Sequence, residues 1–261
     1  MVIVNKLDTV FKSGKKNLLN IYCTAGFPFL NSLEEIIISL QESGADMVEV
    51  GMPYSDPIAD GPVIQKSNMQ ALNNGMTLSI MFTQIEALKE RVHIPVILMG
   101  YLNPVLQYGI EGFCASAQKA GVSGVIIPDL PMFEFRKHYK KWFDKHGLKF
   151  IFLVSPVTDK KRMLLADKLS NGFLYAVSSS SVTGQPGSKP DIEYFDKLRN
   201  ANLKNPVMIG FGIHDKETFD NACLYASGAI IGSAFIRALD TSNNLSIATR
   251  QFVHSIIDRN S

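Results

Sequence analysis

The chain has 261 residues, of which 46% are hydrophobic and 19% are charged. This length and composition allow a large buried core and exclude a disordered or fibrous protein. The 26 basic and 24 acidic residues are scattered along the chain and give a formal net charge of +2. Because no basic block is present, nucleic acid is not expected as a partner.

The chain shows no signal for a membrane or for an oxidising compartment. Residues 1–6 contain no long apolar segment, and no apolar run approaches the roughly 18 residues that a membrane-spanning helix needs. Cys23, Cys114 and Cys223 are odd in number and far apart, so neither a disulfide framework nor a zinc site is predicted. We therefore expect a cytoplasmic protein with reduced thiols and no membrane contact.

Eight short apolar runs alternate with longer amphipathic stretches. This alternation is typical of successive βα units around a parallel sheet. The runs expected to form strands are Leu18–Cys23, Met47–Val50, Pro95–Met99, Gly124–Ile127, Phe150–Val154, Phe173–Val177, Pro206–Ile209 and Ala229–Ile231. Eight such units predict an α/β fold of the (β/α)8 TIM-barrel type.

Helix boundary signals agree with this count. The residues from Ser32 to Glu35 have the sequence of a capping box, which opens a predicted helix that ends at Gly44. Further helix ends or strand entries are expected at Gly75, Gly121, Gly147 and Gly228.

No linker rich in Pro, Gly or Ser divides the chain, so residues 1–261 are expected to form a single barrel domain. A doubly wound dinucleotide-binding sheet is the rival architecture. Such a sheet should carry G-x-G-x-x-G after its first strand, whereas here that strand leads into Thr24-Ala25-Gly26. The barrel is therefore the preferred prediction.

The second expected strand contains an acid close to its carboxyl end, where the active site of such barrels lies. This acid, Glu49, stands among apolar residues. Burial would disfavour its charged form and raise its pKa, which suits a group that moves protons. A structural ion pair inside the barrel is the alternative explanation for a buried acid.

The loop that follows, residues 52–62, is long enough to fold over the barrel mouth as a lid and carries Asp56 and Asp60. Asp60 could close onto a substrate. Because it precedes Gly61 and Pro62, it could also be the N-cap of the next helix. The residue pattern leaves both interpretations open.

Glycines follow three of the last expected strands. Thr183 and Gly184 lie in the loop after the sixth, residues 210–212 (Gly-Phe-Gly) follow the seventh, and Gly232 and Ser233 follow the eighth. Backbone N–H groups at these positions could approach an anion beside the N-terminus of the next helix. Each glycine could serve only a tight turn, but three elements on adjacent strands favour a phosphate site.

No lysine stands at the mouth end of an expected strand, and the five histidines are not at ligand spacing from one another. We interpret the histidines as surface or helix residues: His93, His138, His146, His214 and His254. Neither a Schiff-base lysine nor a metal site is therefore predicted. Cleavage of a carbon–carbon bond would need a substrate that provides its own electron sink.

The segment 48–62, VEVGMPYSDPIADGP, resembles the signature of the tryptophan synthase alpha subunit family. Supporting matches span nearly the whole chain and include residues 24–26, 101–104, 128–131, 181–184, 210–213 and 232–234. The resemblance implies a lyase of L-tryptophan biosynthesis that cleaves indole-3-glycerol phosphate to indole and glyceraldehyde 3-phosphate by a retro-aldol reaction. Protonation of the indole ring at C3 would create the electron sink.

The same resemblance implies roles for individual residues. Glu49 would deliver the proton and help to remove the one on the glycerol hydroxyl, while Asp60 would stabilise the positive charge at the indole N–H. Tyr175 would help to close the pocket. The phosphate-binding residues implied are Thr183, Gly184, Gly212, Gly232 and Ser233. Apolar residues that could sandwich the indole are Phe211, Tyr22, Ile64, Ile127, and either Ile151 or Leu153.

Members of this family pair with a beta subunit that uses pyridoxal phosphate, so an alpha2-beta2 tetramer is expected, with no cofactor or metal in this chain. Residues 53–56, 103–104 and 129–131 match the family's docking region, although Asp129 and Pro131 could simply end the fourth strand. One departure is Ser178–Ser181, where the family often has an arginine that helps to hold the lid loops together. Its absence bears on loop closure and on communication with the beta subunit.

Other functions are weighed against this one. A different phosphate-binding barrel enzyme of tryptophan biosynthesis is disfavoured by the spacing of Glu49 and Asp60. A non-catalytic subunit that only activates a beta partner is disfavoured by the presence of both carboxylates. A stand-alone lyase that releases free indole is compatible with every residue considered.

Overall fold

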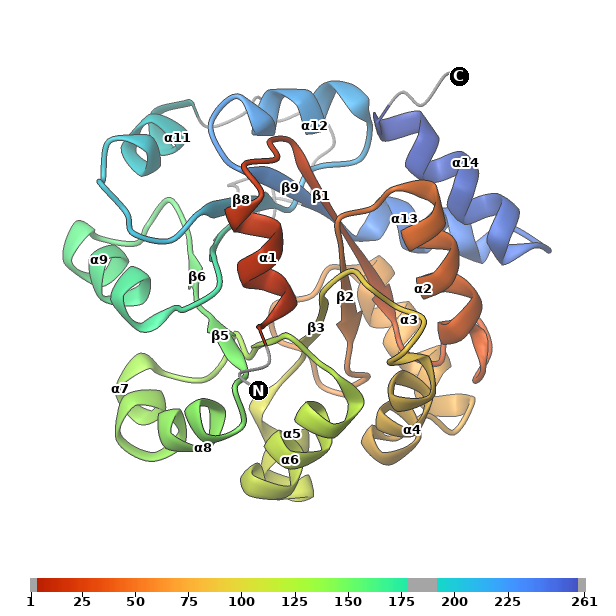
Figure 1. Ribbon diagram of the computed structural model, residues 1–261. Coiled ribbons are helices and arrows are strands. Elements are labelled where there is room, and N and C mark those ends of the chain that lie inside the picture. Colours follow the sequence, from red (N-terminus) through yellow and green to blue (C-terminus); the bar gives the residue numbers. More distant parts are fainter. Residues whose placement is uncertain (1–3, 178–191, 258–261) are drawn as a thin grey trace.

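A computed structural model describes residues 4–177 and 192–257. Within these ranges nine parallel strands form one sheet, in the order β5-β4-β3-β2-β1-β9-β8-β7-β6. The strands are β1 Leu18–Thr24, β2 Met47–Gly51, β3 Val96–Met99, β4 Gly124–Ile126, β5 Lys149–Ile151, β6 Leu153–Val154, β7 Leu174–Val177, β8 Val207–Gly210 and β9 Gly228–Ile231. Because the two edge strands β5 and β6 follow each other in the chain, the sheet curls into a nearly closed barrel (Figure 1). The predicted (β/α)8 architecture is confirmed.

The fifth expected strand differs from the prediction, because it is divided at Phe152 into β5, which pairs with β4, and β6, which pairs with β7. Side chains from the turn before β7 take over the strand's hydrogen bonds at this point. The Phe150 N–H donates to Asn171 Oδ1 (2.7 Å), and the Phe152 N–H donates to Ser170 Oγ (3.0 Å). Polar side chains thus replace part of the backbone ladder where the barrel closes.

Helices surround the barrel (Figure 1). Those of the described chain are α1 Lys6–Lys12, α2 Ser32–Ser43, α3 Pro62–Asn73, α4 Leu78–Leu88, α5 Leu102–Tyr108, α6 Ile110–Ala120, α7 Met132–Glu134, the π-helix η1 Phe135–Tyr139, α8 Lys140–Lys145, α9 Lys160–Leu169, α11 Ile192–Arg199, α12 Lys216–Cys223, α13 Ser233–Asp240 and α14 Leu245–Ile257. None of these helices is long and apolar enough to cross a membrane.

The predicted helix end at Gly44 is confirmed, since Gly44 caps α2 in the left-handed conformation with φ 102°. The capping box at its start is wrong. Ser32 Oγ accepts a hydrogen bond from the Phe29 N–H (3.0 Å), and Glu35 Oε1 accepts one from the Ser246 N–H (3.0 Å). Both side chains therefore have partners outside the first turn of α2.

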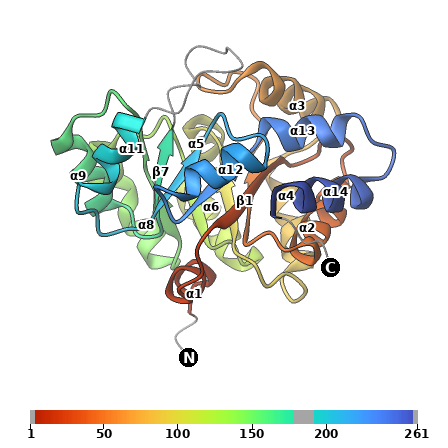
Figure 2. The same cartoon turned by 90° about the horizontal axis from the view of Figure 1, so that it is seen from above.

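Helix α1 closes the end of the barrel at which the strands begin (Figure 2). Leu7 is fully buried there, and its Cδ1 lies 3.0 Å from where a Cβ on Gly124 would stand, at the start of β4. Asn5 Nδ2 donates to the carbonyls of Ser123 (2.8 Å) and Gly147 (3.1 Å), which precede β4 and β5. Since this end is plugged by an apolar side chain, chemistry is directed to the opposite end, as in other barrels of this type.

Candidate active site

Glu49 lies in the middle of β2 and is 1% exposed. Its Oε2 accepts a hydrogen bond from Asn20 Nδ2 on β1 (3.2 Å), and its buried Oε1 has no hydrogen-bond partner among the described residues. Burial raises the pKa of this carboxyl to about 8; the Asn20 hydrogen bond opposes the shift and the charge of Asp60 adds to it. At neutral pH the group is therefore largely protonated.

The structural ion pair considered for Glu49 is not found among the residues that the structure describes. Within the described parts of the chain, no lysine, arginine or histidine lies in ion-pair contact with it. A buried carboxyl without a cation is costly to ionise, and such groups are found at functional sites more often than elsewhere. The prediction that burial raises its pKa is confirmed.

Asp60 lies in the loop between β2 and α3 and is partly buried. Asn68 Nδ2 donates to its Oδ2 (3.3 Å), and the Tyr101 hydroxyl forms a second hydrogen bond with its carboxylate. Burial raises the pKa of Asp60, while these two hydrogen bonds lower it. The carboxylate is thus held at a fixed orientation at the barrel mouth.

The alternative interpretation of Asp60 as a helix cap is wrong. The N-cap of α3 is Gly61, in an extended conformation with φ −72° and ψ 167°, and no side chain caps the helix. Pro62 at the first helical position has no N–H, which removes one of the donors that a cap would satisfy. The Asp60 side chain is therefore available to the mouth, with Asn68 and Tyr101 as its partners.

Two buried tyrosines place their hydroxyl groups at the carboxyl ends of strands. A Cβ on Gly51, the last residue of β2, would lie 2.0 Å from Tyr22 Oη, and one on Gly210, the last residue of β8, would lie 2.2 Å from Tyr175 Oη. Burial raises the pKa of both tyrosines well above its ordinary value, and the charges of Glu49 and Asp60 raise it further. Tyr22 and Tyr175 are therefore neutral groups of the same site as the two acids.

The apolar wall of the site runs along β6, β7 and the turn after β8. The Phe211 ring packs edge-on against Tyr175, with 6.0 Å between the ring centroids, and Leu153 is in register with Tyr175. Ile151 lies at the plugged end, where its Cδ1 is 2.9 Å from the Cβ position of Gly124. Of the two residues offered for the indole pocket, the register favours Leu153.

Strand register also corrects the expectation that Ile127 lines the indole pocket. Successive residues of a strand face opposite sides of the sheet. Glu49 faces the interior and is in register with Ile97 on β3, so Met99 faces the interior too, and Met99 is in register with Ile126. This register gives the inner face of β4 to Ile126, and Ile127 points toward the helices. Ile64, on α3, is partly buried against the core.

The expected phosphate-binding residues that are described lie after two adjacent strands, β8 and β9, with Gly210 in register with Ile230. Phe211 and Gly212 are both in the left-handed region, with φ of 68° and 75°, so the chain turns sharply after β8. Gly232 is the N-cap of α13 and Ser233 its first residue, and no side chain caps this helix. Its first N–H groups are therefore open to an anion.

The other two predicted phosphate residues, Thr183 and Gly184, lie outside the described residues, as does Ser178–Ser181. The structure therefore describes two of the three glycine elements, and these two are brought to neighbouring positions.

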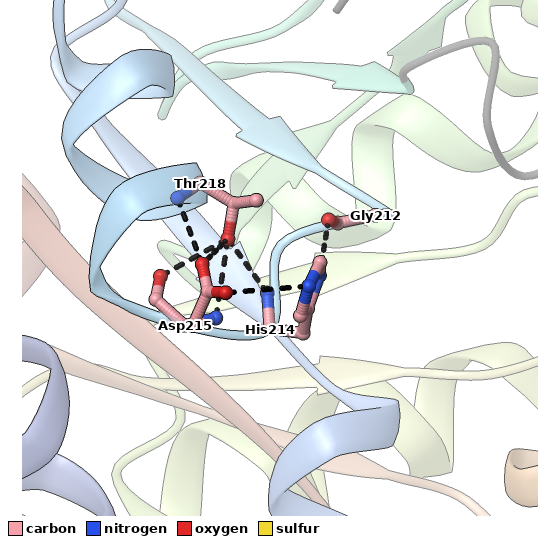
Figure 3. Close-up of polar contacts among 4 residues, drawn as sticks. All are labelled: Gly212, His214, Asp215 and Thr218. Carbon is pink, nitrogen blue, oxygen red and sulfur yellow. Dashed lines mark hydrogen bonds and ion pairs between the residues drawn. The ribbon is translucent and has the colours of Figure 1, made fainter. Parts of the chain in front are cut away.

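The turn after β8 is held by side chains that follow it (Figure 3). His214 Nδ1 is 2.9 Å from the carbonyl oxygen of Gly212, and Asp215 and Thr218 form a capping box at the start of α12. The isolated histidine assigned to the surface is indeed exposed, but its ring also fixes the conformation of Gly212. No three His, Cys, Asp or Glu side chains within residues 4–177 and 192–257 are grouped to hold a metal ion.

The three segments expected at the docking region lie side by side. Asn103 Nδ2 donates to Tyr54 Oη (3.3 Å), the Tyr54 and Tyr101 rings are 5.5 Å apart, and Asp129 Oδ1 accepts from the Leu102 N–H (2.9 Å). Asp129 thus does more than end β4, because it anchors the start of α5. Tyr101 packs its ring against Tyr54 of this cluster and forms a hydrogen bond with Asp60, so the expected docking segments and the acid share a residue.

The model of the family described as "Tryptophan synthase alpha chain" matches residues 9–257. A tryptophan synthase alpha chain from Flavobacterium psychrophilum is 49% identical over 255 residues, which cover 97% of this chain and 100% of that protein. The chain belongs to the tryptophan synthase alpha chain family.

Solved structures of this family have the same fold. The tryptophan synthase subunit alpha of Legionella pneumophila is 33% identical, with a TM-score of 0.88 and coverage of 98% of both chains. A chain of the tryptophan synthase complex from Pyrococcus furiosus is 30% identical, with a TM-score of 0.83 and coverage of 94% of this chain and 99% of that one. Membership in the alpha chain family and the barrel are thus supported by both sequence and structure.

Three residues of the site were not singled out from the sequence: Asn20, Asn68 and Tyr101. Asn20 had a visible signal, because it is a carboxamide in the middle of the apolar run Leu18–Cys23. Tyr101 lies in the segment 101–104 that matches the family, but nothing in that segment indicates a contact with Asp60, which Tyr101 reaches from the N-cap of α5. Asn68 had no signal, because its contact with Asp60 depends on how the loop enters α3.

Proposed function

We propose that the chain cleaves indole-3-glycerol phosphate to indole and glyceraldehyde 3-phosphate, as the alpha subunit of tryptophan synthase in L-tryptophan biosynthesis. The observation that carries this proposal is the buried Glu49, which contacts no cation within the described chain and whose carboxyl has its pKa raised to about 8. A carboxyl that is protonated at neutral pH can act as a general acid there. Membership in the alpha chain family names the substrate.

In the proposed reaction Glu49 gives its proton to C3 of the indole ring, and the ring becomes an iminium-like cation. The resulting Glu49 carboxylate accepts the proton of the glycerol hydroxyl. The electron pair of the bond between C3 and the adjacent glycerol carbon then returns to the ring, the bond breaks, and the hydroxyl carbon becomes the aldehyde. Glu49 ends the cycle protonated, so a single group serves as acid and base.

Asp60 stabilises the cation in this scheme. Protonation at C3 places positive charge at the indole N–H, and a carboxylate fixed before the charge develops stabilises it without reorganisation. The hydrogen bonds from Asn68 and Tyr101 favour the charged form of Asp60 and hold it in place. The division of roles between the two acids follows from their surroundings.

The phosphate of the substrate binds, in this proposal, to the N–H groups at Gly212, Gly232 and Ser233, together with Thr183 and Gly184. An uncapped helix N-terminus favours an anion through both its free N–H groups and its dipole. Tyr175, Phe211 and Leu153 offer the flat apolar surface for the indole ring. Backbone N–H donors thus bind the phosphate end of the substrate, and apolar side chains bind the indole end.

The partner is a tryptophan synthase beta subunit, in an alpha2-beta2 tetramer that we place in the cytoplasm. Two exposed apolar side chains, Ile58 (82%) and Phe133 (57%), follow Tyr54 and Asp129 closely in the chain and supply apolar surface for this interface. Pyridoxal phosphate belongs to the beta subunit, where it supplies the chemistry that joins indole to serine.

The decisive experiment measures indole release from indole-3-glycerol phosphate by the purified chain, alone and with its beta subunit. We expect slow cleavage by the chain alone and a marked increase in kcat when the beta subunit is added. No cleavage under either condition would refute the lyase assignment. An equally high rate with and without the beta subunit would identify a stand-alone lyase instead.

A further inference from the structure

We propose that Asn20 is a positioning residue for the proton transfer: its carboxamide anchors Oε2 of Glu49 and thereby makes Oε1 the oxygen that exchanges protons with the substrate. This inference rests on the proposed lyase function and assigns a role to a residue that the mechanism above does not use.

The geometry distinguishes the two oxygens of Glu49. Asn20 Nδ2 donates to Oε2 at 3.2 Å, while Oε1 is buried and has no partner among the described residues. When the carboxyl is neutral, the oxygen that already accepts a hydrogen bond is the carbonyl oxygen, and the proton resides on the other. The acidic proton is therefore placed on Oε1.

Asn20 is enclosed beside Glu49 in the barrel. It is fully buried on β1, the strand that pairs with β2 and hence with Glu49. Tyr22, two residues after Asn20 and on the same face of β1, is in direct register with Glu49. Its Oδ1 has no hydrogen-bond partner within the described chain. A buried, partly unsatisfied carboxamide within the apolar run Leu18–Cys23 is costly to the stability of the fold, so its presence points to a function.

The orientation of the amide follows from the reaction. Glu49 must become a carboxylate during the reaction. The ionisable groups whose charges interact with that of Glu49 are Tyr22 and Cys23 on β1, Asp60 and Tyr175. None of these is a cation. The hydrogen bond from Asn20 Nδ2 thus stabilises the buried carboxylate when it forms, since a donor to the charged form favours ionisation.

The test compares the wild type with Asn20→Leu, which keeps the approximate volume but removes the donor. Asn20→Ser replaces the carboxamide by a shorter, polar side chain and serves as a second variant if the first folds poorly. Ile21→Val, a change on the outer face of the same strand, is the matched control. For each, kcat and KM for indole formation are measured across pH. The Glu49 carboxyl is titrated by infrared difference spectroscopy, with Glu49→Gln identifying its band.

For Asn20→Leu we expect a loss of about 10- to 100-fold in kcat, with KM little changed, because the substrate is bound by other groups. The Glu49 band should titrate at higher pH than in the wild type, since the carboxylate has lost its donor. An unchanged titration would overturn the proposal even if activity fell. Absence of indole formation by the wild type would instead refute the lyase function, because the titration needs no substrate.

Discussion

Glu49 and Asp60 are two acids at one barrel mouth that are built differently. Each receives a hydrogen bond from an asparagine, Glu49 from Asn20 and Asp60 from Asn68, and burial raises the pKa of both. Glu49, however, is enclosed within a strand with one donor, whereas Asp60 lies on a partly exposed loop and has a second donor in Tyr101. Enclosure favours the protonated form of Glu49, and the extra donor favours the charged form of Asp60.

The largest effect is expected from Glu49→Gln. Gln keeps the size of the side chain and can accept the hydrogen bond from Asn20, but it cannot transfer a proton. Indole formation should fall by about 10³-fold or more, within the range that general acid–base groups supply. Near-normal turnover by the folded variant would contradict the role assigned to Glu49. Glu86→Gln, on the exposed side of α4, is the control for a neutralised glutamate.

A smaller loss is expected for Asp60→Asn, which removes the charge opposite the developing cation but retains the shape. Loss of one preorganised electrostatic partner typically lowers kcat by about 10²-fold. The comparison uses Asp56→Asn, an exposed acid in the same loop, assayed on the isolated chain so that docking does not interfere. If Asp60→Asn were as damaging as Glu49→Gln, the proposed division of roles would be wrong.

The stability of the fold should report the enclosure of Glu49 directly. The carboxyl ionises near 4.5 in its ordinary state and near 8 in the folded protein, so between these pH values the folded state keeps a proton that the unfolded state has lost. The free energy of unfolding therefore falls as pH rises through this window. At roughly 1.4 kcal/mol per pKa unit, the contribution amounts to a few kcal/mol.

The Glu49→Gln variant removes this term, so its gain in stability over the wild type should be absent below pH 4.5 and should grow up to pH 8. Chemical denaturation at a series of pH values measures this difference. A constant difference across the range would mean that Glu49 is not desolvated in the folded chain.

The smallest effect is expected from His214→Ala, beside the proposed phosphate site. This change removes the hydrogen bond to the Gly212 carbonyl seen in Figure 3 and loosens the turn after β8. KM for the substrate should rise roughly 2- to 10-fold, while kcat should change little. We expect a rise near the lower end of this range, because the hydrogen bond of an exposed histidine contributes little free energy. His93→Ala, at the entry of β3, is the matched control. A fall in kcat without a change in KM would contradict the positioning role.

Much of this protein could be predicted from the sequence. The apolar runs follow a local pattern, so the strands were located to within a residue or two, and glycine marked the end of α2 because only glycine adopts its φ readily. Glu49 could be identified because a carboxylate in an apolar strand is visible in one short segment. The capping box failed because Ser32 and Glu35 found partners that local pattern does not reveal.

What the sequence by itself determined is the barrel, the buried acid and the glycines that follow the last strands, because each depends on residues close together in the chain. Only the tertiary structure decided between the two readings of Asp60, chose Leu153 over Ile151, and replaced Ile127 with Ile126 on the inner face. These decisions depend on strand register and on contacts across the closed barrel. The folded arrangement of β1, β2, α3 and the N-cap of α5 likewise brings Asn20, Asn68 and Tyr101 to the two carboxylates, and so sets the proton affinity on which their chemistry depends.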